Sequence, residues 1–273
     1  MSLKGVAKET LRIIEAGGYL APSGAYRDIR AAVSDAVRGT KLFTPEELRC
    51  LLPASPGPSK RPRVFVTAES TQEAAYRLCR EGHQDPLVLN FASARNAGGG
   101  FLRGAKAQEE DLARCSALYP CLITQPRYYE ANRAQDSLLY TDHIIYSPRV
   151  PWFRIRSREL LEEPYIASVV TAPAPNRGQI LRRDPSAVDQ VQETLRRRAG
   201  YILTIAKLET HRVLVLGAWG CGVFQNRPSE VAAAFEWWLG MEPFSASFDL
   251  VVFAVFSNRQ SSDTLQAFRR CFD

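Results

Sequence analysis

From residue 64 onward the chain alternates short, β-rich apolar runs with helical patterns, and this alternation restricts the fold more than any other feature. Strands are expected over residues 64–67, 87–91, 143–146, 166–171, 213–216 and 250–256. Helices are expected over residues 72–80, 107–118, 187–208, 230–239 and 261–272. Strands that are apolar on both faces and separated by helices are typical of a parallel sheet with helices on both sides. The pattern predicts a three-layer α/β/α sandwich with a mixed, mainly parallel sheet.

The first 52 residues differ, because their pattern is mainly helical. We expect helices over residues 1–16 and 26–38, and a third that starts at Thr44. Pro45 and Glu47 follow Thr44 at the spacing of a capping box. Four prolines and a glycine between residues 53 and 62 cannot continue a helix. The sequence therefore predicts a helical accessory region with its linker over residues 1–63, and one larger domain over residues 64–273.

Composition excludes several classes of protein. Of the 273 residues, 45% are hydrophobic and 23% are charged, which excludes a wholly disordered chain. The longest apolar stretch, residues 213–224, contains three glycines and is too short to span a bilayer. The first residues lack the apolar run of a secretory signal, so a cytoplasmic protein without a membrane partner is expected. The six cysteines contain no CxxC pair and the three histidines are isolated, so neither a disulfide framework nor a metal site is expected.

The charge balance, 35 − 29 = +6, favours an anionic partner. The basic residues are spread along the chain, with local groups at residues 60–63 and 196–198. Such short groups are more typical of solvated surfaces than of a nucleic-acid interface, so no sequence-specific nucleic-acid partner is expected. We also expect a monomer.

Two loops between an expected strand and the next helix could present backbone N–H groups to a phosphate. They cover residues 90–104 and 217–226, and both are rich in glycine. In the first, Gly98, Gly99 and Gly100 are consecutive, which suits a backbone with positive φ or a close approach to another group. A flexible surface loop is the alternative. Neither a Walker A motif nor a dinucleotide-binding GxGxxG is present.

Directly after this loop, three acidic residues stand in the opening turn of an expected helix: Glu109, Glu110 and Asp111. Acids at a helix N-terminus are favoured by the macrodipole, and this alone could explain them. Successive helical residues point about 100° apart, so Glu109 and Glu110 cannot flank one bond as a glycosidase pair does. Only one of them is expected to perform acid/base chemistry.

The combination of Gly98, Gly99 and Gly100 with Gln108, Glu109 and Glu110 resembles the signature of poly(ADP-ribose) glycohydrolases. Residues 89–93 and 104–107 are similar to the bacterial-type branch of that family. The resemblance implies a macrodomain-like catalytic domain over residues 64–273, preceded by a helical extension. Ala97 stands where family members often have proline, a departure that removes no functional group.

The resemblance also implies roles for individual residues. Glu110 corresponds to the catalytic acid/base, whereas Glu109 and Gln108 correspond to residues that hold the ribose hydroxyls. The three glycines of the first loop correspond to a diphosphate loop. The second phosphate loop corresponds to Gly220, Cys221, Gly222, Val223 and Phe224, with the Phe224 ring orienting the distal ribose.

Three positions keep alternative interpretations. Either Asn90 or Asn96 corresponds to the ribose-binding asparagine, and the other holds its loop. Phe256 either stacks on adenine or is a core residue at a strand end. Cys221 is interpreted as a small residue that fits a tight loop rather than as a nucleophile, because no histidine is near it in the sequence.

The activity implied is hydrolysis of the ribose–ribose O-glycosidic bond of poly(ADP-ribose), with release of ADP-ribose and without a metal or cofactor. Poly(ADP-ribose) or ADP-ribosylated proteins are the expected partners, and the DNA damage response the expected setting. One alternative is a macrodomain reader that binds ADP-ribose without cleaving it. Another is a hydrolase of mono-ADP-ribosylated protein or of O-acetyl-ADP-ribose. The Gln108-Glu109-Glu110 triplet favours an enzyme, because a reader has no use for an acid there.

Overall fold

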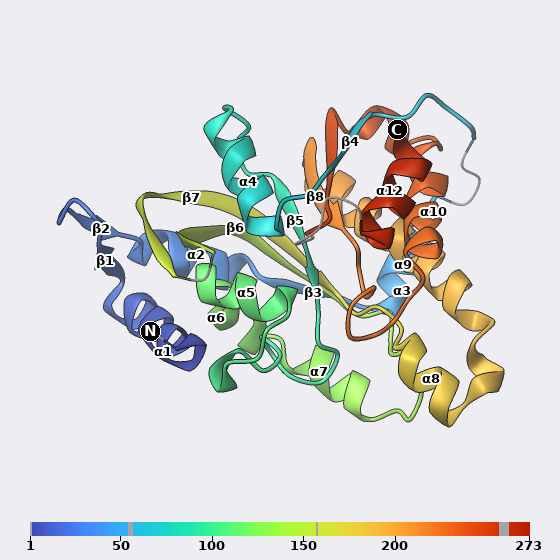
Figure 1. Ribbon diagram of the computed structural model, residues 1–273, viewed down its shortest axis with the longest axis horizontal. Coiled ribbons are helices and arrows are strands. Elements are labelled where there is room, and N and C mark those ends of the chain that lie inside the picture. The colour runs from blue at the N-terminus through green and yellow to red at the C-terminus, as the bar shows by residue number, and fades with distance from the viewer. Residues whose placement is uncertain (1, 54–56, 157, 257–261) are drawn as a thin grey trace.

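The computed structural model describes residues 2–53, 57–156, 158–256 and 262–273 (Figure 1). The strands are β1 (Gly18–Leu20), β2 (Tyr26–Asp28), β3 (Lys41–Phe43), β4 (Arg63–Thr67), β5 (Leu87–Phe91), β6 (Ile144–Ile155), β7 (Glu159–Ala172), β8 (Val213–Gly217) and β9 (Leu250–Ala254). The helices are α1 (Leu3–Ala16), α2 (Arg30–Gly39), α3 (Pro45–Leu51), α4 (Thr71–Arg80), α5 (Gln108–Cys115), α6 (Leu118–Ile123), α7 (Pro126–Arg133), α8 (Arg177–Arg183), α9 (Gln190–Leu208), α10 (Pro228–Leu239), α11 (Phe244–Ser247) and α12 (Asp263–Phe272). Two 3-10 turns are η1 (Phe101–Arg103) and η2 (Pro185–Ala187).

Seven strands form one mixed sheet in the order β3-β6-β7-β5-β8-β9-β4. The run from β7 to β4 is parallel, whereas β6 pairs antiparallel with β7 and β3 pairs antiparallel with β6. β1 and β2 form a separate antiparallel ribbon. The predicted α/β class with a mainly parallel sheet is confirmed. Because β5 and β8 are parallel neighbours, the loops that follow them leave the same edge of the sheet.

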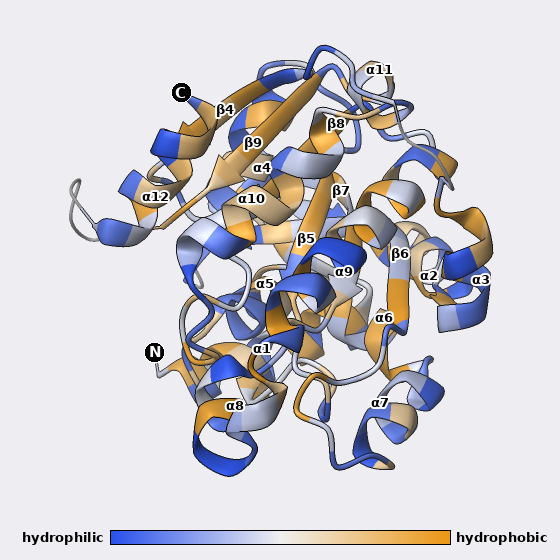
Figure 2. Cartoon of the chain, turned by 90° about the vertical axis from the view of Figure 1, so that its right-hand side faces the viewer, coloured by the Kyte–Doolittle hydropathy of each residue, from blue (hydrophilic) through white to orange (hydrophobic). Residues whose placement is uncertain are grey.

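Helices cover both faces of this sheet. One buried cluster joins it to α9, α10 and α12, and a second joins it to α2, α4, α5 and α6. Figure 2 shows hydrophobic central strands, with hydrophilic residues on the outer turns of α3, α7 and α8. Among the described residues, no helix is both long and apolar enough to cross a membrane.

Several sequence predictions about elements were wrong. Residues 26–28 form β2 rather than the start of a helix, and α2 begins only at Arg30. The helix expected over residues 107–118 is broken at Ser116, which has an extended backbone and forms a bridge with Trp152. The strand expected over residues 143–146 continues to Ile155 as β6, and a register shift between Ser147 and Val150 accommodates Pro148. The capping box on α3, in contrast, is confirmed.

The N-terminal region is built into the main domain. β3 was not predicted, and it is an edge strand of the seven-stranded sheet. α1 packs against η1 and α5, with Ala7, Phe101 and Ala113 forming a small buried cluster between them. The division at residue 63 remains a prediction about domains, but the two regions share a sheet and a core.

Candidate active site

α5 follows the first glycine loop in the chain and carries the candidate carboxyls in its first turn. Glu109 and Glu110 are both buried, with 2% and 8% of their surface exposed. Acidic residues at this end of a helix are stabilised by the unpaired N–H groups and the macrodipole. The sequence Gln-Glu-Glu-Asp therefore places its carboxyls where an N-terminal helical turn can hold them in the interior.

The glycine loop wraps around the Glu110 carboxylate. Gly98 and Gly99 have positive φ, at 65° and 58°. A Cβ at Gly99 would collide with Oε1 of Glu110, so the close approach requires glycine. The Gly100 N–H donates a hydrogen bond of 2.9 Å to that same Oε1. The other oxygen, Oε2, is buried without a hydrogen-bond partner among the described residues.

Glu109 is held entirely by protein groups. Its Oε2 accepts a hydrogen bond of 2.7 Å from the Ser93 N–H, and its Oε1 accepts one of 3.3 Å from Nδ2 of Asn90. Burial raises the pKa of Glu109 to about 8, against the opposing effect of N–H donors at Ser93, Asn90 and Gly98. Burial therefore disfavours the charged form of Glu109, whereas the N–H donors around its carboxyl favour that form.

Gln108 connects α5 to the end of β5. Its Oε1 accepts a hydrogen bond of 2.8 Å from the Phe91 N–H. Its Nε2 donates to the Leu89 carbonyl at 2.8 Å and to Oγ1 of Thr71 at 3.2 Å. Both ends of this amide are thus engaged within the protein. The contacts set the position of α5 relative to the sheet.

The two candidate asparagines lie in different environments. Asn90 is fully buried, and its Nδ2 donates to Glu109 and, at 3.2 Å, to Oγ1 of Thr171. Its Oδ1 is buried without a partner among the residues that the structure describes. Asn96 is exposed, and its carbonyl accepts the Gly99 N–H at 3.0 Å. Asn90 therefore lies with the carboxyls, whereas Asn96 shapes the loop through its backbone.

The glycine amides of the first loop are bonded, whereas three amides of the second loop have no acceptor among the described residues. The N–H groups of Gly98, Gly99 and Gly100 are bonded to Glu109, Asn96 and Glu110. In the second loop the N–H groups of Gly222, Val223 and Phe224 donate to no acceptor within the described part of the chain. Val223 is 78% exposed, so this backbone is open to solvent. Three successive free N–H groups form a site that suits an anion.

The rest of the second loop is rigid. Gly220 has a φ of 72° and packs against Asn226, whose Nδ2 donates to the Pro175 carbonyl at 2.9 Å. Burial raises the pKa of the Cys221 thiol to about 12, so at neutral pH it is protonated and a poor nucleophile. This agrees with the interpretation of Cys221 as a small residue in a tight loop.

Aromatic residues flank this loop. The Phe224 ring lies 6.0 Å from that of Tyr140, centroid to centroid. Phe256 is 64% exposed at the end of β9, so it is not a core residue. Ser257 and Asn258, which follow it, lie outside the described residues.

Sequence reasoning missed three residues of this region: Thr171, Asn226 and Tyr140. The alternation that located the strands carried no signal for them, because each acts through a contact between distant segments. Thr171 lies near the end of β7 beside Asn90, and Asn226 closes the second loop. Tyr140 lies in a connection where no element was expected.

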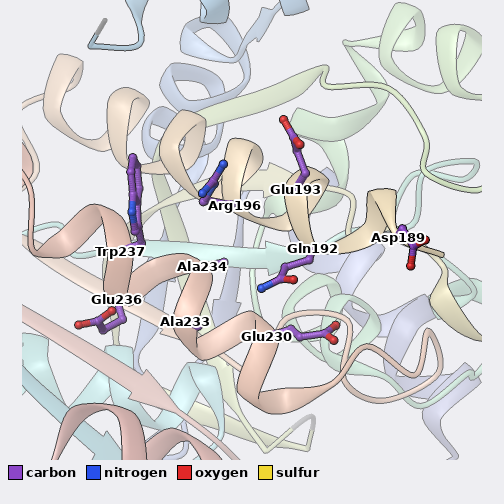
Figure 3. Close-up of a pocket in the computed structure, with 9 residues that line it drawn as sticks. All are labelled: Asp189, Gln192, Glu193, Arg196, Glu230, Ala233, Ala234, Glu236 and Trp237. Carbon is purple, nitrogen blue, oxygen red and sulfur yellow. The ribbon is translucent and has the colours of Figure 1, made fainter. Parts of the chain in front are cut away.

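A cavity of about 450 Å³ lies elsewhere, between α9 and α10 (Figure 3). Its wall includes Asp189, Glu193, Glu230 and Glu236, with Arg196 stacked over Trp237 at 5.1 Å. Four carboxylates would repel a diphosphate. The edge formed by the loops after β5 and β8 suits an anion better than this cavity does. In the part of the chain that the structure describes, no group of His, Cys, Asp and Glu is placed to hold a metal ion.

The fold and the site together define a class of protein. This is a macrodomain-like enzyme in which one strand–helix loop offers free amides to an anion. The neighbouring loop holds a buried carboxyl with one unpartnered oxygen.

Comparison with known proteins narrows this class. A profile of the family described as microbial-type PARG, catalytic domain, matches residues 7–155. The chain is 45% identical to a mutant poly(ADP-ribose) glycohydrolase from Thermomonospora curvata, with a TM-score of 0.91 and 99% of each chain covered. It is 46% identical to the glycohydrolase from that organism bound to the inhibitor ADP-HPD, with a TM-score of 0.91 and 98% of each chain covered.

A more distant match in structure is the glycohydrolase from Deinococcus radiodurans in complex with ADP-ribose. It is 45% identical, with a TM-score of 0.78, and the alignment covers 87% of this chain and 95% of the other. A comparison with curated proteins finds no match. The chain belongs to the microbial-type poly(ADP-ribose) glycohydrolase family.

Proposed function

We propose that Glu110 is the general acid and base of this glycohydrolase, and that the bond cleaved is the ribose–ribose O-glycosidic bond of poly(ADP-ribose). The observation that carries the proposal is the hydrogen bonding of the Glu110 carboxyl oxygens. Oε1 is fixed by the Gly100 N–H, whereas Oε2 is buried and unpartnered among the described residues. A buried acceptor without a partner is costly, and a substrate hydroxyl or water would satisfy it.

The reaction needs one proton to move twice. Protonated Glu110 donates its proton to the 2′-oxygen of the leaving ribose as the C1″–O bond breaks, and positive charge develops at C1″. Glu110, now a carboxylate, accepts a proton from the water that attacks C1″. One water is consumed, Glu110 regains its proton, and ADP-ribose leaves the chain end.

The remaining site residues bind the substrate or position the groups that do. The free amides of Gly222, Val223 and Phe224 hold the diphosphate. Gln108 and Glu109 position α5 and the first loop through the bonds described above, and they hold the ribose hydroxyls around the scissile bond. Asn90 offers its unpartnered Oδ1 to a ribose hydroxyl. The exposed Phe256 ring stacks on adenine.

The setting of the reaction is also part of the proposal. Catalysis proceeds without a metal ion, since a carboxyl and ordered amides supply the acid, the base and the anion binding. The protein acts as a monomer in the cytoplasm, serves the DNA damage response, and has no sequence-specific nucleic-acid partner. Metal dependence is tested by the rate of ADP-ribose release after treatment with a chelator, where a rate equal to that of untreated enzyme is expected.

The acid/base assignment is tested with Glu110→Gln, which keeps the shape of the side chain but cannot cycle a proton. We expect ADP-ribose release from automodified polymer to fall by about 10³-fold or more, since general acid/base catalysis contributes about 10² to 10⁴ per step. The Kd for ADP-ribose, measured by calorimetry, should change little. Glu159→Gln, at an exposed position on β7, is the matched control and should keep wild-type turnover.

Two results would contradict the proposal. Near wild-type turnover by Glu110→Gln would remove Glu110 from the chemistry. Wild-type protein that binds ADP-ribose but releases none from polymer would indicate a reader. A mono-ADP-ribosylated acceptor, assayed in parallel, distinguishes a polymer hydrolase from an enzyme that removes the protein-linked unit.

A further inference from the structure

One face of α1 carries three exposed cations at helical spacing. Lys4, Lys8 and Arg12 are four residues apart and all are exposed. Residues four apart share a helix face, so the three side chains form a stripe of about 12 Å along α1. The opposite face of α1 is buried through Val6, Thr10 and Ile13, and Ala7 and Leu11, beside the stripe, pack in the small cluster with Phe101.

The stripe continues onto the segment between the glycine loop and α5. A Cβ placed on Gly104 would lie 3.3 Å from the backbone nitrogen of Lys4 and 3.6 Å from the Cβ of Lys4. The start of α1 is therefore in contact with this segment. The segment carries two further exposed cations, Arg103 and Lys106. Together, Lys4, Lys8, Arg12, Arg103 and Lys106 are called the α1 basic surface below.

This surface adjoins the catalytic carboxyl through rigid contacts. Gly100, whose N–H holds Glu110, is followed directly by η1, and η1 packs on α1. Oγ1 of Thr10 donates a hydrogen bond of 2.8 Å to the Arg114 carbonyl of α5. Figure 1 shows α1 and α5 on the same side of the sheet.

The charges of the surface are available to a ligand. Within the described residues, none of its five cations forms an ion pair. Glu9, on the same helix, is engaged with Arg154 at 2.8 Å. Glu15 is the exposed carboxyl at the far end of the stripe. Five cations with one nearby exposed anion make a locally positive surface.

We infer that the α1 basic surface binds the part of the poly(ADP-ribose) chain that extends beyond the scissile bond. The inference rests on the proposed function. If the second loop holds the terminal diphosphate and Glu110 meets the scissile bond, the remainder of the polymer leaves the site on the Glu110 side. Each further unit of that chain carries two phosphate charges. The exposed cations of the α1 basic surface, next to η1, would contact these phosphates.

The test uses Lys4→Gln/Lys8→Gln/Arg12→Gln, which removes three charges and keeps good helix formers on α1. The control, Lys60→Gln/Lys207→Gln/Arg270→Gln, removes three exposed cations elsewhere. Both variants have a net charge of 6 − 3 = +3, so they differ only in where the charge was lost. The affinity for long poly(ADP-ribose) is measured in the Glu110→Gln background, where cleavage is expected to be too slow to shorten the polymer during the measurement, over about 50 to 300 mM salt.

We expect the α1 variant to bind polymer about tenfold more weakly than the control variant. The slope of log K against log salt should become shallower by about 2, since about 0.7 is lost per phosphate contact on a single strand. The Kd for ADP-ribose itself should stay the same in both variants. With Glu110 intact, the loss should appear in KM for polymer.

Equal polymer affinities and equal salt slopes in the two variants would overturn the inference. So would single-stranded RNA that competes for the α1 basic surface as well as polymer of the same charge does, because the surface would then be a general polyanion site. These outcomes are separate from failure of the proposed function, which shows as wild-type protein that releases no ADP-ribose from polymer.

Discussion

Gly99 and Glu110 constrain each other, and this pair defines the site at the scale of single residues. Gly99 needs a positive φ and leaves space that Oε1 of Glu110 occupies. Gly222, in the second loop, has no heavy atom within 4 Å of an added Cβ. A side chain is therefore excluded by Glu110 at position 99, whereas there is space for one at position 222.

Gly99→Ala should lower both stability and turnover. The left-handed backbone costs a residue with a Cβ about 1 to 2 kcal/mol, and the collision with Glu110 would displace the carboxyl. We expect a lower Tm in thermal unfolding and a fall in kcat. Gly222→Ala is the matched control and should keep the wild-type Tm; an equal loss of Tm in both variants would contradict the argument.

Val223→Pro tests the free amides of the second loop. Proline removes one N–H donor, and a hydrogen bond to a charged group is worth about 1.5 to 3 kcal/mol. The Kd for ADP-ribose, measured by calorimetry, should rise by about 10- to 100-fold. Val223→Ala keeps the N–H and should bind as wild type does. Unchanged affinity in the proline variant would place the diphosphate elsewhere.

At this scale the sequence predicted the residue types but not every contact. The spacing of the glycines and of Gln108, Glu109 and Glu110 located the carboxyls, because those residues follow one another along the chain. The bonds of Gln108 to Phe91 and Leu89 could not be foreseen, since they depend on how α5 docks on β5. Only the folded loops distinguish the bonded amides of residues 98–100 from the free amides of residues 222–224.

α1 braces the catalytic helix at the scale of elements. It packs on η1 through the cluster with Phe101, and Thr10 bonds to the last turn of α5. α1, which precedes residues 64–273 in the chain, therefore helps to position α5 in the fold. Helical periodicity predicted α1, but no local signal specified its partner.

Thr10→Val should destabilise the protein by about 1 to 2 kcal/mol, because the buried Arg114 carbonyl loses its donor while the side-chain volume is kept. Urea unfolding at neutral pH measures the change. Thr10→Ser keeps the hydroxyl and should recover most of the loss. If the serine variant were as unstable as the valine variant, the hydrogen bond would not be the cause.

The elements that the sequence missed share a physical reason. β3 and β2 are three residues long, too short for a periodic pattern. β6 contains Pro148 and Pro151, which argue against a strand when read locally. Pro148 lies within a register shift against β7, and Pro151 is paired with Ile166. The parallel strands β4, β5 and β8 and the long helix α9 were predicted well because their apolar pattern is regular, whereas β6 and β7 were predicted too short.

At the scale of the whole molecule, a buried histidine joins segments at the opposite edge of the sheet from the site. Nε2 of His211 lies 2.8 Å from the Tyr146 hydroxyl, and Nδ1 lies 3.1 Å from the Asp85 carbonyl. Burial lowers the pKa of His211 below its ordinary value of 6.5. His211 therefore binds a proton less readily in the folded state than in the unfolded chain.

The stability that depends on neutral His211 is present above the unfolded pKa and is lost as the pH falls below it. We expect the free energy of unfolding to decrease more between about pH 7.5 and about pH 5.5 in wild type than in His211→Gln. Urea unfolding at both pH values measures this, and comparing the two proteins removes the contributions of other groups. Equal decreases in the two proteins would show that His211 does not set the acid limit.

β3 has a consequence for how the chain can be shortened. It pairs with residues 144–146 at the start of β6, a long strand in the antiparallel part of the sheet. A fragment that starts at residue 64 would present the unpaired backbone of β6 to other molecules, and exposed edges of this kind recruit strands from neighbouring chains. Such a fragment should aggregate even though it retains Glu110 and both loops, so the N-terminal region protects the sheet from self-association.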